Sequence, residues 1–364
     1  MKHVECVVVG GGPAGLNAAN ALLEAGVSVL LIDRATSLGG QLIKQTHKFF
    51  GSQKQHAKVR GFDIAKLLIN NIKDHPLCEI WTNTTVVALY PNNIITTYDN
   101  HVYQEIKADK IILATGASEK SLAFENNDLP QVMGAGAIQT LMNVHGVLPA
   151  KEVVMIGSGN IGLIVSYQLL QANIKVKAVI EASDKIGGYA VHASKLVRHN
   201  VPIYTRKTIK KAIGVEHVEA VEIVSVDEHF NEIENTSEII PCDTVCIAVG
   251  LSPLHQLASM INVKTKYIPQ LGGVVAIVNE TFQTSHPDVY IVGDALGIEE
   301  ASSAMMEGAC CGLHVSSSLH KKHPQHDELL IDYHDQLKQL RSGPYGKHTL
   351  AGLEIMQKEA SNVR

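Results

Sequence analysis

Apolar residues in this chain gather into short runs that stop at glycine-rich turns. Residues 4–9 (VECVVV) form an apolar run typical of a buried strand, and residues 13–25 repeat apolar positions at helical spacing. A second apolar run, residues 27–32, ends on Asp33. The pattern predicts a strand, a glycine turn, a helix and a second strand within one unit of about 30 residues.

The same pattern recurs near the middle of the chain. Residues 152–156 (EVVMI) predict a strand and residues 160–172 a helix. Residues 175–180 predict a further strand, which ends on Glu181. A glycine pair follows each carboxylate, as Gly39-Gly40 after Asp33 and as Gly187-Gly188 after Glu181. Repetition of this kind predicts two copies of one α/β unit.

Both turns have the sequence G-x-G-x-x-G, which suits the binding of a dinucleotide. Gly10 permits a tight turn, Gly12 lets the backbone approach a pyrophosphate, and Gly15 lets the helix pack closely on the strand. The N-terminus of the helix attracts the phosphates, and Asp33 can accept hydrogen bonds from a ribose. The second copy keeps these positions as Gly157, Gly159, Gly162 and Glu181. The alternative interpretation is that the second copy is a relic that binds nothing.

A third element distinguishes the first copy from the second. Residues 288–292 predict a strand that ends in Gly293-Asp294, and residues 301–318 predict a helix. An aspartate at this place can take the ribityl or pyrophosphate end of an extended flavin nucleotide. The N-terminus of the following helix can place its dipole against the flavin ring. The first site is therefore predicted to bind FAD.

The predicted fold class is α/β, with two Rossmann-like domains, the second inserted in the first. The FAD-binding domain is expected to be discontinuous, formed by residues 1–117 and 250–325, because Gly293-Asp294 must return to the first turn. Residues 118–249 are expected to form the NAD(P)-binding domain.

Two further segments are expected to complete the first domain. Residues 78–107 are rich in Thr, Val, Ile and Tyr, with turn signals at residues 91–93 and 99–100, and predict strands that cover the first domain. Residues 326–364 predict a C-terminal helical tail, with one helical stripe made of Leu329, Leu330, Tyr333, Leu337 and Leu340. Such a stripe favours packing on its own domain, and contact with a partner or a second copy is the alternative.

Composition excludes several classes of function. The chain has 364 residues, of which 45% are hydrophobic and 18% charged, as in globular proteins. A net charge of −5 argues against a nucleic-acid binder or an anionic-membrane binder. No apolar run approaches the about 18–20 residues of a membrane span. We therefore expect a cytoplasmic protein with neither nucleic acid nor membrane as a partner.

The spacing of cysteines and histidines argues against a metal centre. None of the six cysteines forms C-x-x-C, and none has zinc or iron–sulfur spacing. The adjacent Cys310 and Cys311 fall in a predicted helix, which favours buried thiols over a vicinal disulfide. Another group, His314, His320, His323 and His326, overlaps a polar stretch interrupted by proline, which favours a solvated linker. No metal ligand is predicted.

Five motifs together resemble a known superfamily. They are residues 7–15 (VVVGGGPAG), 39–41 (GGQ), 114–116 (ATG), 157–162 (GSGNIG) and 290–294 (YIVGD). In this order they resemble the two-domain FAD/NAD(P) flavoproteins of the thioredoxin reductase and pyridine nucleotide-disulfide oxidoreductase superfamily. Residues 129–143 and 297–313 are similar to the FAD-containing α subunits of opine oxidase, hydrogen cyanide synthase, dye-linked proline dehydrogenase and heterotetrameric sarcosine oxidase.

The resemblance implies two sets of cofactor-binding residues. The FAD set is Gly10, Gly12, Pro13, Ala14, Gly15, Asp33, Arg34, Gly40, Gln41, Val86, Ala114, Thr115, Gly116, Gly293 and Asp294. The set for the second nucleotide is Gly157, Gly159, Asn160, Ile161, Gly162, Glu181 and Gly250. Two departures stand out, because the redox C-x-x-C and the cysteine-rich iron–sulfur segment after the Gly-Asp motif are both missing. Any iron–sulfur centre is therefore expected in another subunit.

Two functions from different classes follow. The first is an FAD-dependent oxidoreductase that passes a hydride between NAD(H) and flavin, then electrons to an acceptor or partner subunit, without a redox disulfide. The second is an electron-relaying α subunit of an amine or amino-acid dehydrogenase of the opine, proline or sarcosine type, with a second flavoprotein or iron–sulfur subunit. A small-molecule substrate or electron acceptor is expected for the first function, whereas the relay subunit would have no substrate of its own. An oligomer is expected. NADH is predicted over NADPH, because Glu181 would repel a 2′-phosphate.

No catalytic side chain can be assigned from the sequence. Lys44, His47 and Lys48 follow the GGQ turn and are expected near the flavin, where they could neutralise charge or meet an acceptor. The alternative is a solvated loop, or cations that bind the FAD pyrophosphate.

Overall fold

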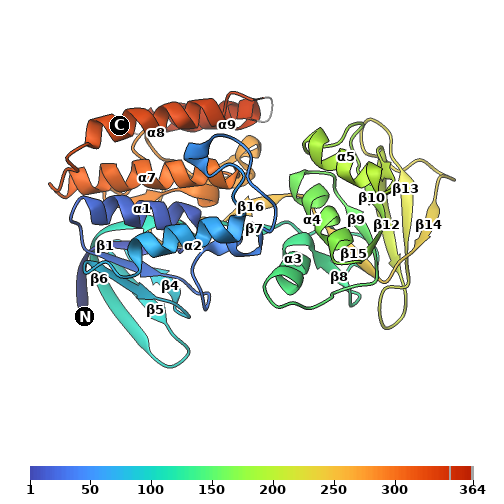
Figure 1. Cartoon of the computed structure of the whole chain (residues 1–364), viewed down its shortest axis with the longest axis horizontal. Coiled ribbons are helices and arrows are strands. Elements are labelled where there is room, and N and C mark those ends of the chain that lie inside the picture. The colour runs from blue at the N-terminus through green and yellow to red at the C-terminus, as the bar shows by residue number, and fades with distance from the viewer. Residues whose placement is uncertain (344–345, 362–364) are drawn as a thin grey trace. The chain divides into compact units, whose positions relative to one another are not determined.

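The computed structural model describes residues 1–343 and 346–361, which fall into two compact units (Figure 1). The first unit contains residues 1–118 and the chain from residue 252 onward, and the second contains residues 119–251. The chain leaves the first unit at β7 (Ala117–Glu119) and returns at β16 (Leu251–Pro253), and these short strands pair. The predicted α/β class with two Rossmann-like units, one inserted in the other, is confirmed.

The first unit is built on one large mixed sheet. Its strand order is β3-β2-β1-β6-β5-β4, with β19 paired to β6. The strands are β1 (Lys2–Val9), β2 (Val29–Ile32), β3 (Cys78–Trp81), β4 (Thr85–Leu89), β5 (Ile94–Tyr98), β6 (Tyr103–Leu113) and β19 (Val289–Ile291). Strands β3, β2, β1, β6 and β19 pair in parallel, whereas β4, β5 and β6 form an antiparallel meander. All four residues of β2 are buried, as expected for a strand with both faces covered.

The predicted strands of residues 78–107 belong to this same sheet. Asn93 lies in the turn between β4 and β5, and Asn100 lies in the turn between β5 and β6. Both have positive φ, 59° and 73°, a conformation that asparagine tolerates better than most residues. The turn signals in the sequence therefore mark the real corners of the meander.

The first unit also contains several long helices. They are α1 (Pro13–Glu24), α2 (Gly61–Ile72), α7 (Ala301–Ser318), α8 (His326–Leu340) and α9 (Gly346–Ser361). Figure 1 shows α1 next to the sheet, then α7, then α8. The approach of α1 and α7 is close, because a Cβ added to Gly308 would lie 2.0 Å from the backbone oxygen of Ala14.

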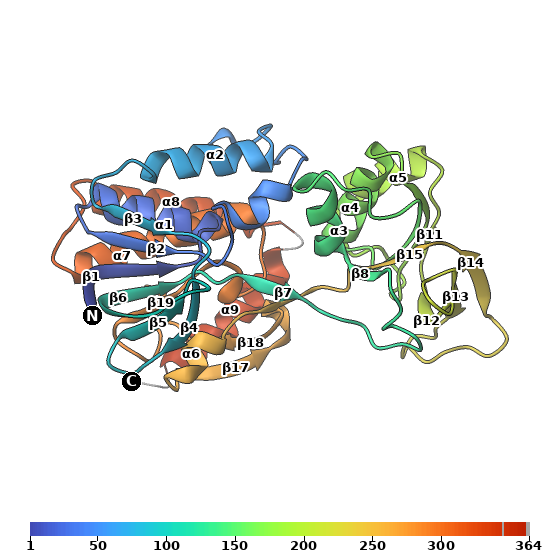
Figure 2. The ribbon, with the colours of Figure 1, turned by 90° about the horizontal axis from the view of Figure 1, so that it is seen from below.

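The tail belongs to the first unit. Leu337 is buried, and Leu330, Tyr333 and Leu340 pack against the core of that unit. Helix α9 packs on β17 (Thr265–Ile268) and on the 3-10 turn η3 (Pro269–Leu271), which precedes β18 (Gly273–Ala276) (Figure 2). The remaining helix of this part of the chain is α6 (Gln256–Met260). None of the helices in the described ranges combines the length and apolar character needed to cross a membrane.

The second unit contains a smaller parallel sheet. Its strand order is β11-β10-β9-β15-β8. The strands are β8 (Val132–Gly134), β9 (Glu152–Ile156), β10 (Lys175–Ile180), β11 (Ile203–Tyr204) and β15 (Thr244–Ile247), and the helices are α3 (Ala135–Asn143), α4 (Asn160–Gln171) and α5 (Ala190–Arg198). A separate antiparallel sheet contains β12 (Lys207–Ile213), β13 (Ala220–Ser225) and β14 (Glu238–Pro241). The order β10-β9-β15 repeats the order β2-β1-β6 of the first unit.

Candidate functional site

The first glycine turn joins β1 to α1. Gly10 has a φ of 108°, and a Cβ there would lie 2.3 Å from the backbone oxygen of Ala114. A Cβ on Gly15 would lie 1.8 Å from the oxygen of Gly10. These two glycines are therefore required by the protein itself, because the chain passes too close for a side chain.

Gly12 has a different reason to be glycine. Its φ of −80° and ψ of −173° suit any residue. The nearest atom to a Cβ at this position is the Cα of Gly40, at 3.9 Å. Gly12 also caps the N-terminus of α1, and Pro13 occupies the first turn of the helix. The space at Gly12 is thus available to a ligand, and the positive end of the helix dipole favours an anionic one.

Asp33, at the end of β2, holds the turn in place. Its Oδ2 accepts the N–H of Gly11 at 2.6 Å, and its Oδ1 accepts the N–H of Ala35 at 2.8 Å. A carboxylate oxygen can accept two hydrogen bonds, so each oxygen keeps one acceptor position. Gly39 donates its N–H to the oxygen of Gly11 at 2.8 Å, which brings the GGQ turn onto the glycine turn.

The strand β19 brings the Gly-Asp motif to the same place. Gly293 begins the 3-10 turn η4 (Gly293–Ala295), and a Cβ there would lie 2.8 Å from the Cβ of Ala14 on α1. Asp294 is half-buried, and burial raises the pKa of its carboxyl to about 6, with the charge of Glu299 adding to the rise. The structure therefore brings the third predicted element to the N-terminus of α1.

The remaining predicted FAD residues differ in their burial and contacts. Ala114 is buried and donates its N–H to the oxygen of Val9 at 2.8 Å. The Oγ1 of Thr115 donates to the oxygen of Leu254 at 2.9 Å, and Gly116 has a φ of 73°. Arg34 and Gln41 are exposed, while Val86 on β4 is half-buried.

The second glycine turn repeats the first in detail. Gly157 has a φ of 104°, and a Cβ there would lie 2.3 Å from the oxygen of Ala248. A Cβ on Gly162 would lie 2.2 Å from the oxygen of Gly157. A Cβ on Gly159 would have no neighbour within 4 Å among the described residues. The turn thus leaves the same space at the N-terminus of its helix, here α4. Ile161 is 38% exposed beside it.

Glu181 ties the second turn more tightly than Asp33 ties the first. Its Oε2 accepts both the N–H and the hydroxyl of Ser158, and its Oε1 accepts the N–H of Ser183 at 2.9 Å. The hydroxyl of Ser158 in turn accepts the N–H of Gly187 at 3.0 Å. Ser158 was not predicted from the sequence, although its place in the turn, where the first copy has Gly11, was a usable signal.

The other predicted residues of the second site have structural partners. Asn160 accepts the N–H of Tyr189 through its Oδ1 at 2.8 Å, and Gly250 accepts the N–H of Lys120 at 3.0 Å. Arg206 was missed, because it follows β11 and is far from Glu181 in sequence. Its N–H donates to the oxygen of Ser183 at 2.9 Å, which places an exposed arginine beside the loop after Glu181. Only the pairing of β11 with β10 brings the two together.

The segment after the GGQ turn is ordered by its own contacts. Lys48 pairs with Arg60 through an isolated β-bridge, and Arg60 donates from Nη1 to the oxygen of Thr46 at 2.6 Å. The ring of His47 stacks on Phe49, with 5.7 Å between centroids. This segment is therefore a folded loop rather than a fully solvated one.

The cysteines are unsuited to redox exchange. Cys6, Cys242, Cys246, Cys310 and Cys311 are buried, and all six cysteines are free. Burial raises the pKa of Cys242 and of Cys310 to about 12, and that of Cys78 to about 11. A thiolate, the reactive form, is therefore scarce at neutral pH. In the part of the chain that the structure describes, no three His, Cys, Asp or Glu side chains group to hold a metal ion.

The predicted solvated linker around His326 is wrong in part. His326 is buried at the start of α8, with 7% of its surface exposed, and its ring lies 6.3 Å from that of His314 on α7. The sequence suggested a polar stretch because lysines and a proline flank this residue. Packing of α8 on α7 buries it nevertheless.

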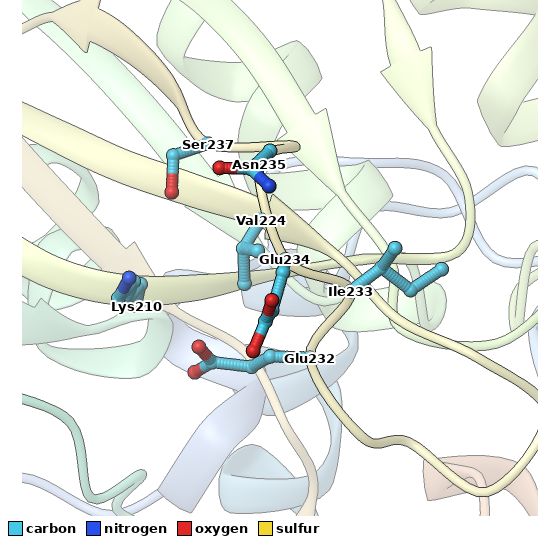
Figure 3. A pocket seen from close by; sticks show the side chains of 7 residues that line it. All are labelled: Lys210, Val224, Glu232, Ile233, Glu234, Asn235 and Ser237. Carbon is cyan, nitrogen blue, oxygen red and sulfur yellow. The ribbon is translucent and has the colours of Figure 1, made fainter.

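A cavity of about 240 Å³ lies elsewhere in the second unit (Figure 3). It is lined by Lys210, Val224, Glu232, Ile233, Glu234, Asn235 and Ser237. These residues come from β12, β13 and the loop before β14, not from the parallel sheet that carries the second glycine turn. The cavity is therefore separate from both candidate nucleotide sites.

Comparison with known proteins agrees with this geometry. Residues 4–308 match the model of a family described as pyridine nucleotide-disulphide oxidoreductase. The chain is 30% identical over 270 residues to the alpha subunit of sarcosine oxidase from Rhizobium meliloti (strain 1021), covering 70% of this chain and 25% of that protein. It thus spans about a quarter of that relative's length.

Two further proteins are similar over most of the chain. An opine oxidase subunit of Rhizobium meliloti (strain 1021) is 26% identical over 349 residues, which cover 91% of this chain and 74% of that protein. The crystal structure of L-proline dehydrogenase from P. horikoshii matches with a TM-score of 0.72 and 21% identity, over 93% of this chain and 59% of that one. The superfamily resemblance predicted from the five motifs is confirmed, and these relatives are oxidoreductases.

Proposed function

Because the chain belongs to the pyridine nucleotide-disulphide oxidoreductase family, we propose that it is an oxidoreductase that moves a hydride between NAD(H) and FAD and then passes electrons to an acceptor or partner subunit. One observation carries this proposal. Two glycine turns share the same geometry, and each is held by a carboxylate, but only the first also receives a Gly-Asp motif from a distant strand. The asymmetry favours FAD at the first turn and a nicotinamide nucleotide at the second.

The residues at the first turn fit FAD. When bound, FAD would supply hydride acceptance and electron release, chemistry that the protein side chains lack. Gly12 leaves room for a pyrophosphate, the N-terminus of α1 favours its charge, and Asp33 retains acceptor positions for a ribose. Asp294, with its pKa raised to about 6, would hold a proton on its carboxyl more readily than an exposed aspartate does.

The second turn suits NADH better than NADPH. Glu181 ends β10, where a carboxylate accepts from ribose hydroxyls, and its charge would repel a 2′-phosphate. Its Oε1 keeps an acceptor position beside the N–H of Ser183. Gly159 leaves the space that a pyrophosphate needs.

The exit of electrons differs from that in disulfide reductases. Five of the six thiols are buried and that of Cys78 is half-buried. The raised pKa values of Cys242, Cys310 and Cys78 disfavour the thiolate, so the chain offers no dithiol suited to receive electrons. We therefore propose an acceptor outside the chain.

The direct test is anaerobic addition of NADH to the purified chain. We expect a bound flavin whose absorbance at about 450 nm bleaches within seconds. Absence of bound flavin, or absence of bleaching with either NADH or NADPH, would contradict the proposal.

A second candidate has its own support. The sarcosine oxidase and opine oxidase relatives are subunits of larger enzymes, and the sarcosine oxidase protein is several times longer than the matched region. In this alternative the chain relays electrons for an amine or amino-acid dehydrogenase and has no substrate of its own. Bleaching that requires a partner protein and an amine, and that NADH does not produce, would favour this candidate.

A further inference from the structure

Arg341, which follows α8, joins the tail to two buried carboxylates. Its Nε lies 3.1 Å from both oxygens of Glu299, and its Nη2 lies 2.7 Å from Glu299 Oε1. The same Nη2 contacts Glu307 Oε1 on α7. The side chains of Arg341, Glu299 and Glu307 are only 13%, 10% and 4% exposed. A charged cluster buried this deeply is held strongly, because breaking one pair leaves an uncompensated charge.

Both glutamates form hydrogen bonds with the Gly-Asp motif. The second oxygen of Glu307 accepts the N–H of Gly293 at 2.9 Å. The backbone N–H of Glu299 contacts Oδ1 of Asp294 at 3.4 Å. Burial raises the pKa of the Glu307 carboxyl, and the guanidinium of Arg341 opposes that rise. Arg341 thus stabilises the groups that fix the turn at Gly293.

Helix α8 also contacts the segment that follows the GGQ turn. Asp332 on α8 forms an ion pair with Lys54, and Gln336 accepts a hydrogen bond from the side chain of Gln55. Gln336 and Asp332 are themselves joined, at 2.7 Å. Gln55 and Gln336 are buried, with 4% and 5% of their surface exposed. Lys54 and Gln55 form the 3-10 turn η2 (Gln53–Gln55), between the GGQ turn and α2.

We propose that α8 is a strap that holds two segments around the candidate flavin site, with Arg341 as a positioning residue for Gly293 and Asp294. The proposal rests on the FAD site proposed above. A loop fixed before the ligand arrives loses less conformational entropy on binding, so the strap would raise affinity for FAD without touching it. Arg341 directly follows the C-terminal end of α8, and Asp332 and Gln336 lie earlier on the helix, so α8 is held at separate points along its length.

The test compares FAD binding by apoprotein variants with a matched control. Arg341→Met removes the guanidinium group, whereas Arg341→Lys keeps the positive charge. If Arg341→Met fails to fold, Glu299→Gln replaces it as the variant that removes one carboxylate. Glu359→Gln is the control, because it also removes a carboxylate of the tail, one that pairs with Lys264 and Lys266 rather than with Arg341. We expect Arg341→Met to weaken FAD binding about 10- to 100-fold, Arg341→Lys less than this, and Glu359→Gln less than about twofold.

Amide hydrogen exchange of the apoprotein supplies a readout that needs no flavin. Exchange in residues 293–299 should accelerate at least about tenfold in Arg341→Met and stay unchanged in β1. Equal FAD affinity in Arg341→Met and wild type, or equal weakening by Glu359→Gln, would overturn the strap. If Arg341→Met shows this faster exchange but the wild-type protein binds no FAD, the result would instead overturn the proposed flavin site.

Discussion

Ser158 donates both its backbone N–H and its hydroxyl to one oxygen of Glu181, at 3.0 and 2.6 Å. In the first unit, Gly11 donates only its N–H to Asp33. Oε2 of Glu181 is therefore saturated, and only Oε1 can still accept a hydrogen bond from a ribose.

The preference of the second site for NADH over NADPH should depend on the charge of Glu181. Wild-type protein is expected to favour NADH over NADPH by about a hundredfold in flavin reduction rate at low salt, and Glu181→Gln should narrow the ratio about tenfold. Asp184→Asn is the matched control, because this residue has the same charge but lies at an exposed position outside the glycine turn. A preference for NADPH would instead implicate Arg206, and Arg206→Gln should then abolish it.

Gly12 and Gly159 allow each nucleotide site to be disabled without the other. Gly12 and Gly159 have extended φ and ψ and room for a Cβ, so a side chain there should leave the fold intact. We expect Gly12→Val to give colourless protein, because the valine occupies the pyrophosphate position. Gly159→Val should stay yellow but lose reduction by NADH at least about a hundredfold.

Absorption spectra and circular dichroism of both variants would check this. Full flavin occupancy in Gly12→Val would contradict the assignment of FAD to the first turn. Loss of flavin in Gly159→Val with an unchanged spectrum of secondary structure would reverse the two sites.

Gly308 sets the distance between α7 and α1. Because a Cβ there would lie 2.0 Å from the backbone oxygen of Ala14, Gly308→Ala must push the helices apart. We expect a loss of about 2–3 kcal/mol in the free energy of unfolding, together with weaker flavin retention, since α1 carries the first turn. Gly343→Ala is the control, because a Cβ at Gly343 meets no atom of the described residues within 4 Å. Urea denaturation of both variants measures the difference, and equal stability would contradict it.

The sequence predicted the features that depend on neighbouring residues. The turn at Gly10 and the strand that ends on Asp33 follow from local spacing, and a repeat of that spacing predicted the second unit. The roles of Arg341 and Arg206 could not be predicted in this way. Arg341 lies 34 residues from Glu307, and only the packing of α8 on α7 brings them together. Arg206 lies beside Ser183 only because β11 pairs with β10.

The tail shows the limit of a pattern based on polarity. Its apolar stripe correctly predicted that Leu337 is buried. The burial of Gln336 and His326 could not be predicted, because polar residues are more typical of the solvent-exposed face of a helix. Their burial depends on partners from other segments, such as Gln55, and no periodicity reveals such partners.

Stability of the first unit should fall in mild acid because of His314. Its Nε2 is buried without a hydrogen-bond partner among the residues that the structure describes. Its ring centroid lies 6.3 Å from that of His326 and 6.4 Å from that of His334. Burial and these two imidazoles lower the pKa of His314 to about 4. An unfolded histidine has a pKa of about 6.5, so between these values the unfolded chain binds a proton that the folded chain does not. Stability is therefore unaffected above pH of about 6.5 and declines as the pH falls toward 4.

Denaturation at pH 7.5 and 5.0, followed by fluorescence of the single tryptophan, Trp81 on β3, would measure this decline in the first unit. The full shift corresponds to about 3 kcal/mol, and partial exposure of the ring should reduce the observed loss to about 1–2 kcal/mol. His314→Leu should remove most of the pH dependence, because leucine fills the space without binding a proton. His348→Gln, at an exposed position on α9, should leave the pH dependence unchanged. A decline of equal size in His314→Leu would assign the acid sensitivity to His326, whose pKa burial also lowers.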